Sequence, residues 1–380
     1  MIHSIYNFDD LGIQVECATY EAENGVNEHH LMLHVIARGD LFSGQYQRLC
    51  EGERRMLDLP KFKDASAVMR RYFLSDSTNQ VVCMKETDAN CAYSYIQQPP
   101  LDGSKVAMWI YLVDNVEVSH SDGTTIVAHN GYQHLWRMGM HYGEGNSATQ
   151  TTYLLESYEA DLEKYCATLR DNCLRTWFFV RDVDTQYMGM VKARKENFIA
   201  QGLTEHTHYI ASTGIQGLPA DPHAIIQLGA YSLTGMEGKQ IHYLYAPSHL
   251  NPTYEYGVTF ERGTVVEYGD RAHALISGTA SINNKGEVVH VGDIDGQTRR
   301  MIENVKVLLD EGGFAETDVA QIIVYIRDLC DFERVKQLIN EHYANVPQIF
   351  TLAPVCRPEW LVEMECIAIK KQNNPEFRAF

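Results

Sequence analysis

The same succession of apolar and polar patterns occurs three times along the chain. In the last copy it predicts a strand, an amphipathic helix, a buried strand, a second helix and a closing strand, at 273–282, 294–313, 319–328, 332–344 and 360–370. Apolar residues recur at helical spacing in the first of these helices. The run at 319–326 is apolar throughout, which is typical of a strand that helices cover.

The two earlier copies follow the same order. The middle copy has its elements at 132–141, 153–169, 174–182, 187–202 and 224–233. The first copy has elements at 31–39, 46–59, 66–76 and 104–113, and its second helix is hard to find between Asp76 and Cys91. Repeats of about a hundred residues indicate duplicated domains, because solenoid units are shorter.

We therefore expect three α+β domains, with their sheets toward the centre and their helices outside. The predicted domains are 1–115, 116–240 and 241–371, and 372–380 is expected to be a frayed tail. Laying the closing strands over one another puts Ala107, Gln227 and Glu363 at one position. Because only the third copy has a carboxylate there, we expect one working site, built mainly by that copy.

Composition narrows the class of protein. The chain has 380 residues, 45% of them apolar, and a net charge of −18, which disfavours binding to nucleic-acid phosphates. No apolar run is long enough to span a membrane, and the first ten residues do not resemble a signal peptide. The nine cysteines contain no CxxC pair, as expected in a reducing compartment. We predict a cytoplasmic protein without membrane, nucleic-acid, metal or nucleotide partners.

The third copy resembles the Rid family of reactive-intermediate deaminases, also called L-PSP endoribonucleases. The resemblance is carried by SGTASI, GDIDGQTRRMIENVKVLL, VYIRDLCDF and LVEMECIA. It implies a trimer of such domains with clefts between neighbours, so three copies in one chain would form a monomeric pseudo-trimer. Rid deaminases carry a substrate-gripping arginine fifteen residues before the acid, and Gln348 occupies that place here. This difference disfavours imine hydrolysis.

A longer stretch resembles the chorismatases. It comprises GYQHLWRM, LRTWFFVRDVD with VKARKENF, IASTGI, YGVTFERG, ISGTASI and VCRPEWLVEME, in that order. The resemblance implies cofactor-free cleavage of the enolpyruvyl ether of chorismate, or of a related small anion. The products would be pyruvate and a hydroxybenzoate or a cyclohexadiene diol.

The resemblance places the catalytic acid on Glu363. Glu363 and Glu365 share one face of the closing strand, and the alternative for both is a solvated strand face. Burial would raise the pKa of Glu363 and keep its carboxyl protonated. Cys356 is either a small buried residue or the pocket cysteine of the branch that makes 3-hydroxybenzoate. Gly263 would leave room in the same pocket.

A substrate with two carboxylates needs fixed cations, and the candidates are Arg262, Arg357, Lys336 and Arg194. Each could instead be an ordinary surface charge. Gly278 would let the backbone approach a ligand closely. Tyr256 belongs to a tyrosine-rich stretch that we expect to pack against a core edge or a ligand.

Three functions remain open: a chorismatase-like lyase or hydrolase, a Rid-type enamine or imine deaminase, and a ligand-binding protein without turnover. Gln348 disfavours the second. A carboxylate kept in one copy alone disfavours the third.

Overall fold

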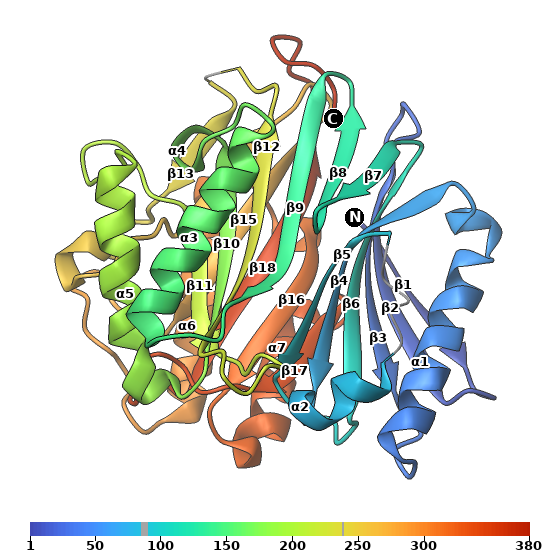
Figure 1. The fold of residues 1–380 in the computed structure, drawn as a ribbon. Helices are drawn as coiled ribbons and strands as arrows, with labels where there is room; N and C mark the ends of the chain where they lie inside the picture. Colours follow the sequence, from blue (N-terminus) through green and yellow to red (C-terminus); the bar gives the residue numbers. More distant parts are fainter. Residues whose placement is uncertain (85–89, 238) are drawn as a thin grey trace.

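The computed structural model describes residues 1–84, 90–237 and 239–380, without the side chain of Tyr256. Its backbone forms three six-stranded mixed sheets, one from each repeat (Figure 1). The first sheet has the order β1-β2-β3-β6-β4-β5, with β1 (Ile2–Phe8), β2 (Ile13–Tyr20), β3 (Glu28–Val35), β4 (Ala65–Leu74), β5 (Ala92–Gln97) and β6 (Val106–Asp114). The α+β class and the Rid-like topology of each repeat are confirmed.

The other two sheets have the same plan. The second has the order β11-β10-β12-β9-β8-β7, with β7 (Glu117–Ser121), β8 (Thr124–His129), β9 (Tyr132–His141), β10 (Cys173–Val180), β11 (Ala211–Gln216) and β12 (Ile226–Thr234). The third has the order β13-β14-β15-β18-β16-β17, with β13 (Ile241–Leu244), β14 (Gly263–Glu267), β15 (Arg271–Ala280), β16 (Val319–Ile326), β17 (Gln348–Leu352) and β18 (Val362–Lys371). In each sheet the edge strand β5, β11 or β17 runs parallel to its neighbour.

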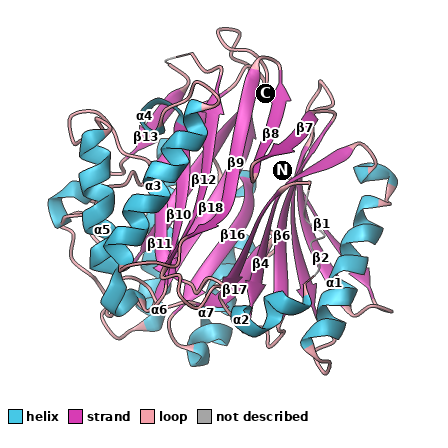
Figure 2. Cartoon of the chain, viewed as in Figure 1, coloured by secondary structure: helices cyan, strands magenta, loops and turns pink. Residues whose placement is uncertain are grey.

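Helices lie on the outside of the three sheets (Figure 2). The long helices are α1 (Phe42–Leu57), α3 (Ser147–Glu163), α5 (Val183–Ala200), α6 (Ile294–Glu311) and α7 (Phe332–Tyr343). The short ones are α2 (Ser77–Gln80) and α4 (Leu169–Asn172). In the first repeat, the described residues provide only α2 and a 3-10 turn at Val81–Cys83 where the other repeats have α5 and α7.

The aspartate that follows each central strand has a local structural role in two of the repeats. Asp76 accepts a hydrogen bond from the backbone of Asn79, and Asp328 accepts one from the backbone of Cys330. Such side-chain acceptors satisfy the free N–H groups at a helix start. Asp182 instead adopts a left-handed backbone conformation, with φ of 49°, before α5.

A common core joins the three repeats. The buried guanidinium of Arg71, on β4, lies over the rings of Trp109 and Trp177 at 5.2 and 4.8 Å. It also lies 3.6 Å from the carboxylate of Glu365, on β18. One side chain of the first repeat therefore contacts both other repeats, and this charge is buried only because it has partners.

The expectation of a frayed tail is wrong. Phe380 is 1% exposed, and its backbone N–H donates to the carboxylate of Asp270 at 2.8 Å. Its ring packs against His134 of the second repeat and Tyr268 of the third, at 4.7 and 5.1 Å between centroids. The terminal aromatic residue thus anchors the tail across two repeats.

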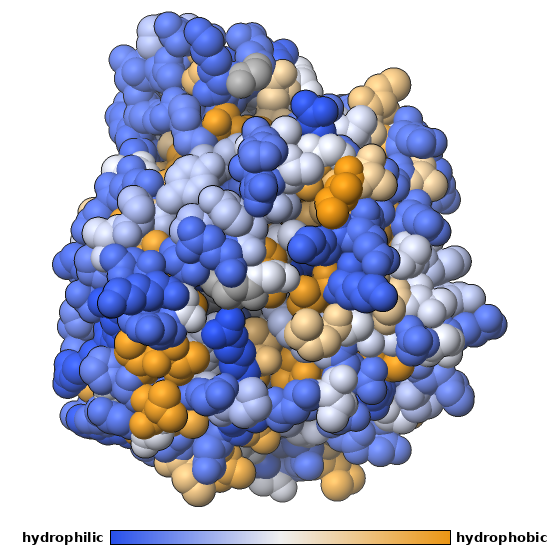
Figure 3. Space-filling model, turned by 90° about the vertical axis from the view of Figure 1, so that its left-hand side faces the viewer, coloured by the Kyte–Doolittle hydropathy of each residue, from blue (hydrophilic) through white to orange (hydrophobic). Residues whose placement is uncertain are grey.

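The outer surface on the side of α3 and α5 is mostly hydrophilic, with small separate apolar patches (Figure 3). Within the described part of the chain, no helix has both the length and the apolar character that crossing a membrane requires.

Candidate functional site

The repeats meet through their parallel edge strands. Strand β5 packs against β9, and β11 packs against β15. A residue of each edge strand also makes a single bridge to the next repeat, at Gln97–Leu218, Ile215–Val355 and Pro100–Thr351. The molecule therefore has three related interfaces, and a cavity lies at each.

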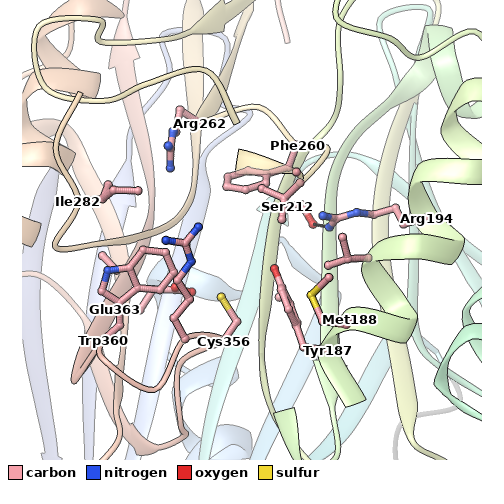
Figure 4. Close-up of a pocket in the computed structure, with 17 residues that line it drawn as sticks. Tyr187, Met188, Arg194, Ser212, Phe260, Arg262, Ile282, Cys356, Trp360 and Glu363 are labelled. Atoms are coloured by element: carbon pink, nitrogen blue, oxygen red, sulfur yellow. Dashed lines mark hydrogen bonds between the residues drawn. The ribbon is translucent and has the colours of Figure 1, made fainter. Parts of the chain in front are cut away.

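The cavity between the second and third repeats contains most of the expected site residues. It has a volume of about 190 Å³ and is lined by Tyr187, Met188, Val191, Arg194, Ser212, Gly214, Gly257, Val258, Phe260, Arg262, Gly278, Ala280, Ile282, Cys356, Arg357, Trp360 and Glu363. In Figure 4, Glu363, Cys356 and Trp360 lie on one side, and Tyr187, Met188 and Arg194 reach in from α5 on the other. The site is therefore shared by two repeats.

Glu363 is a buried acid in the wall of this cavity. Its side chain points from β18 into the site, and the residue is 5% exposed, so the solvated strand face is excluded. Burial, reinforced by the negative charge of Glu365, raises the pKa of Glu363 to about 8. The carboxyl is therefore mostly protonated at neutral pH and can donate a proton.

Glu365 remains buried through a set of strong donors. It accepts hydrogen bonds from Arg175 and from the indole N–H of Trp177, both at 2.8 Å, and from the hydroxyl of Thr213. All three donors belong to the second repeat. The two neighbouring carboxyls thus differ in environment, since Glu365 is held by cations and donors while Glu363 faces the cavity.

Gly278 makes room for the acid. It lies in a bulge of β15 opposite β18, and a Cβ there would lie 2.2 Å from Oε1 of Glu363. The backbone N–H of Gly278 donates to the hydroxyl of Thr213 at 2.9 Å. Any larger residue would displace the carboxyl, so the glycine is required for space.

Cys356 lies beside Glu363 and stays a thiol. Burial and the nearby Glu363 raise the pKa of Cys356 to about 12, although a hydrogen bond with Tyr187 opposes this. The same surroundings raise the pKa of the Tyr187 hydroxyl well above its usual range. Both groups therefore offer protons for hydrogen bonding, and neither supplies an anionic nucleophile.

Three of the four expected cations line the cavity. Arg262 is buried and donates to the backbone carbonyl of Asn251 at 3.0 Å. Arg357 stacks over the ring of Trp360 at 4.8 Å. Arg194, on α5, is buried and donates to the hydroxyl of Ser212 at 3.4 Å. These contacts fix guanidinium groups around a small, largely apolar space.

Two expected residues lie elsewhere. Lys336 lines the cavity between the third and first repeats, 5.5 Å above the ring of Phe332, and so does not join Glu363. A Cβ on Gly263 would meet Leu244 and Ile276, so this glycine serves the packing of β14 and does not widen the site. The side chain of Tyr256 lies outside the described residues.

Gln348 also belongs to the cavity between the third and first repeats. The equivalent of Gln348 in the second repeat lies across from Glu363. Gln348 pairs with Ile322 on β16, and the equivalent residue beside β10 is Ser212. Ser212 is the residue that Arg194 contacts. A guanidinium from a helix therefore reaches the place opposite the acid, and Gln348, which lines another cavity, does not disfavour deamination at this site.

Sequence reasoning missed Tyr187, Ser212, Phe260 and Trp360. Tyr187 and Ser212 come from the second repeat and meet the acid only once the repeats are assembled. Phe260 and Trp360 belong to the motifs YGVTFERG and VCRPEWLVEME, and their aromatic side chains could have marked them as pocket residues. Among the residues that the structure describes, no group of three or more His, Cys, Asp or Glu side chains could hold a metal ion.

Comparison with known proteins defines the family. A RutC family protein of Pyrococcus abyssi is 39% identical over 88 residues, which are 23% of this chain and 68% of that protein. The 3-aminoacrylate deaminase RutC of Acinetobacter baylyi is 28% identical over 95 residues, 24% of this chain and 75% of that enzyme. Residues 264–370 match the family described as endoribonuclease L-PSP. The chain belongs to the RutC family, and its third repeat carries the match.

The whole assembly has a wider structural likeness. A solved crystal structure of a chorismatase is similar with a TM-score of 0.63 at 17% sequence identity, and the match covers 80% of this chain and 93% of that one. The likeness establishes a shared fold, as the second resemblance predicted.

Proposed function

We propose that the protein is a chorismatase-like enzyme that cleaves the enolpyruvyl ether of chorismate or a close relative. The observation that carries the proposal is a buried carboxyl, Glu363, with a pKa of about 8 in a cavity ringed by guanidinium groups. An enol ether is cleaved when its methylene carbon gains a proton, and a protonated acid supplies one without a cofactor.

Size and polarity support a small organic anion as the substrate. The cavity of about 190 Å³ is smaller than the roughly 300–1,000 Å³ of pockets for drug-sized ligands. Phe260, Ile282 and Trp360 offer apolar surface for a ring. Arg262, Arg357 and Arg194 offer donors for carboxylates, and guanidinium groups suit this task because of their forked geometry.

The proposed reaction starts with proton transfer from Glu363 to the substrate's methylene carbon. The resulting oxocarbenium carbon is captured by water, one proton of which returns to the Glu363 carboxylate, and the hydroxyl proton of the hemiketal so formed passes to the ether oxygen. Collapse of the adduct breaks the ether bond and releases pyruvate. The guanidinium groups hold the carboxylates so that the methylene faces the acid, which is catalysis by orientation. In this scheme the thiol of Cys356 packs beside the ring or donates a hydrogen bond to it.

A second candidate is a Rid-type deaminase acting on an enamine carboxylate. The specific observation in its favour is Arg194, which reaches Ser212 opposite Glu363. The similarity to a 3-aminoacrylate deaminase agrees with it. The same acid would protonate the enamine carbon, and the same guanidinium would bind the carboxylate.

One experiment separates the two candidates. Purified protein is incubated with chorismate, with pyruvate measured by coupling to lactate dehydrogenase, and separately with an enzymatically generated enamine carboxylate, with ammonia measured. We expect pyruvate from chorismate and no acceleration of ammonia release. Ammonia release without pyruvate would favour the deaminase, and neither activity would favour the binding protein. We also expect a monomer in solution, because each chain contains all three repeats.

A further inference from the structure

The cavity between the first and second repeats is the counterpart of the site that contains Glu363. Gln227 pairs with Phe179 on β10, as Glu363 pairs with Tyr325 on β16, so the two residues occupy the same position in their sheets. Gln227 has the shape of glutamate and cannot give up a proton. This second cleft can therefore bind a ligand without the acid chemistry.

The second cleft also repeats the backbone device that makes room at the catalytic position. Strand β9 has a bulge opposite β12, as β15 has opposite β18, and Gly139 holds the place of Gly278. Gly139 has a φ of +69°, and a Cβ there would lie 2.7 Å from the carbonyl oxygen of Tyr93. In the cleft between the third and first repeats, Ala107 holds the position of Glu363, and strands β3 and β6 pair there without such a bulge. Two of the three clefts thus keep the arrangement.

Two buried polar groups in the cleft between the first and second repeats have no hydrogen-bond partner among the described residues. Gln227 is 2% exposed, and its Nε2 has no hydrogen-bond partner in the described part of the chain. Ser94, at the position of Thr213, is 1% exposed, and its hydroxyl likewise has none among the described residues. Burying such groups unpaired is unfavourable, so an acceptor oxygen from a ligand would stabilise them.

The walls indicate what else the ligand contains. The cleft has a volume of about 610 Å³ and is lined by Tyr93, Tyr95, Met138 and Arg137, among others. The rings of Tyr93 and Tyr95 lie 5.2 Å apart, and methionine packs well against aromatic rings. Arg137 adds a cation, partly balanced by Asp161 at 3.1 Å. The cleft between the third and first repeats is smaller, at about 130 Å³, and has His34 lying 3.5 Å from Glu16.

We infer that the cleft between the first and second repeats is a second, non-catalytic binding site for a small aromatic carboxylate. The carboxylate accepts hydrogen bonds from Gln227 and Ser94 and faces Arg137. The ring packs against Tyr93, Tyr95 and Met138. This inference does not depend on which reaction occurs at Glu363.

Methionine side chains provide a separate reporter for each cavity, because Met138 lines the second cleft and Met188 lines the site of Glu363. The full chain is labelled with ¹³C-methyl methionine and titrated with benzoate to millimolar concentration. The Met138 signal is assigned with Met138→Leu and the Met188 signal with Met188→Leu. We expect a saturable shift of the Met138 signal.

The matched variants are Gln227→Leu, which keeps the size and removes the amide, and Ser94→Ala, which is the smaller change. Losing one hydrogen bond should weaken the Met138 response about threefold to tenfold in either variant. The response of Met188 should stay as in the parent. A Met138 signal that never moves, or that moves with unchanged affinity in both variants, would overturn the inference. A response confined to Met188 would overturn it as well.

Discussion

Gly278 and Glu363 are matched across two neighbouring strands, and the space left by the missing side chain of the glycine holds the carboxyl. A Cβ on Gly278 would come within 2.2 Å of Oε1 of Glu363. The acid can therefore sit in the cavity only while this position has no side chain. Two residues 85 positions apart in the sequence form one unit of the site.

Gly278→Ala should move the carboxyl of Glu363 out of line with the substrate. We expect kcat for pyruvate release to fall about 10²-fold, as small misplacements of a catalytic group do. The control is Gly39→Ala, because an added Cβ there has open space around it. Parent-like kcat in Gly278→Ala, with melting temperatures close to the parent in both variants, would refute the role given to the glycine.

The pH dependence of activity should report the pKa of Glu363. The acid must be protonated to act, so activity should be full below pH 7 as far as Glu363 is concerned. It should then fall about tenfold per pH unit above the pKa of about 8. A profile of kcat/KM from pH 6 to pH 10 measures this descending limb.

Glu365→Gln tests the cause of that limb. The charge of Glu365 raises the pKa of Glu363, so its removal should shift the descending limb to lower pH. The shift is the informative readout, since the variant also leaves Arg175 less well paired and should be less stable. A limb that stays in place in a folded variant would contradict the contribution of Glu365 to the raised pKa of Glu363.

Burial of Glu363 should also make the free energy of unfolding depend on pH. The folded pKa of Glu363 lies above its ordinary value of 4.5, so between pH 4.5 and about 8 the folded state binds the extra proton. The free energy of unfolding then decreases as pH rises, by at most about 1.4 kcal/mol per unit from this group. Glu363→Gln does not ionise, so its stability relative to the parent should increase from pH 5.5 to pH 7.5. Urea unfolding of both proteins measures the difference, and a constant difference would contradict the raised pKa.

Arg262 should contribute mainly to substrate binding. Arg262→Met keeps much of the volume and removes the charge, and we expect KM for chorismate to rise about 10–100-fold, with a smaller change in kcat. The control is Arg299→Ala, which removes an exposed pair with Glu341 and should leave both constants unchanged. Equal KM values in Arg262→Met and the parent would exclude Arg262 from the binding site.

Local pattern was enough to predict the long helices and three of the six strands of each sheet, because their apolar spacing survives in every copy. It did not predict the remaining strands, which include the parallel edge strands β5, β11 and β17. Local pattern also identified Glu363, since aligning the closing strands gives a carboxylate at a position that is Ala107 in the first copy and Gln227 in the middle copy. The tail was misjudged because QNNPEFRAF is polar on average. It is held in place by Phe380, which packs against rings from distant parts of the chain, and by hydrogen bonds such as the one from the backbone N–H of Gly269 to the carbonyl of Arg378 at 2.7 Å.

The sequence alone did not show which faces of the repeats lie against one another. Gln348 and Lys336 lie close to Glu363 in the sequence and line a different cavity. Ser212 and Tyr187 lie far away and line the same one. The parallel edge strand of each repeat lies against the neighbouring sheet. Residues that are close in the sequence can therefore line different cavities, and residues far apart can line the same one.

The proposed function depends on Glu363 donating the proton that cleaves an enolpyruvyl ether. The most direct measurement compares the parent with Glu363→Gln for pyruvate release from chorismate, with chorismate binding followed by calorimetry. We expect pyruvate from the parent, a fall in kcat of about 10²–10⁴-fold in the variant, and binding within a few-fold of the parent. Pyruvate release at the parent rate from Glu363→Gln, or none from the parent, would contradict it.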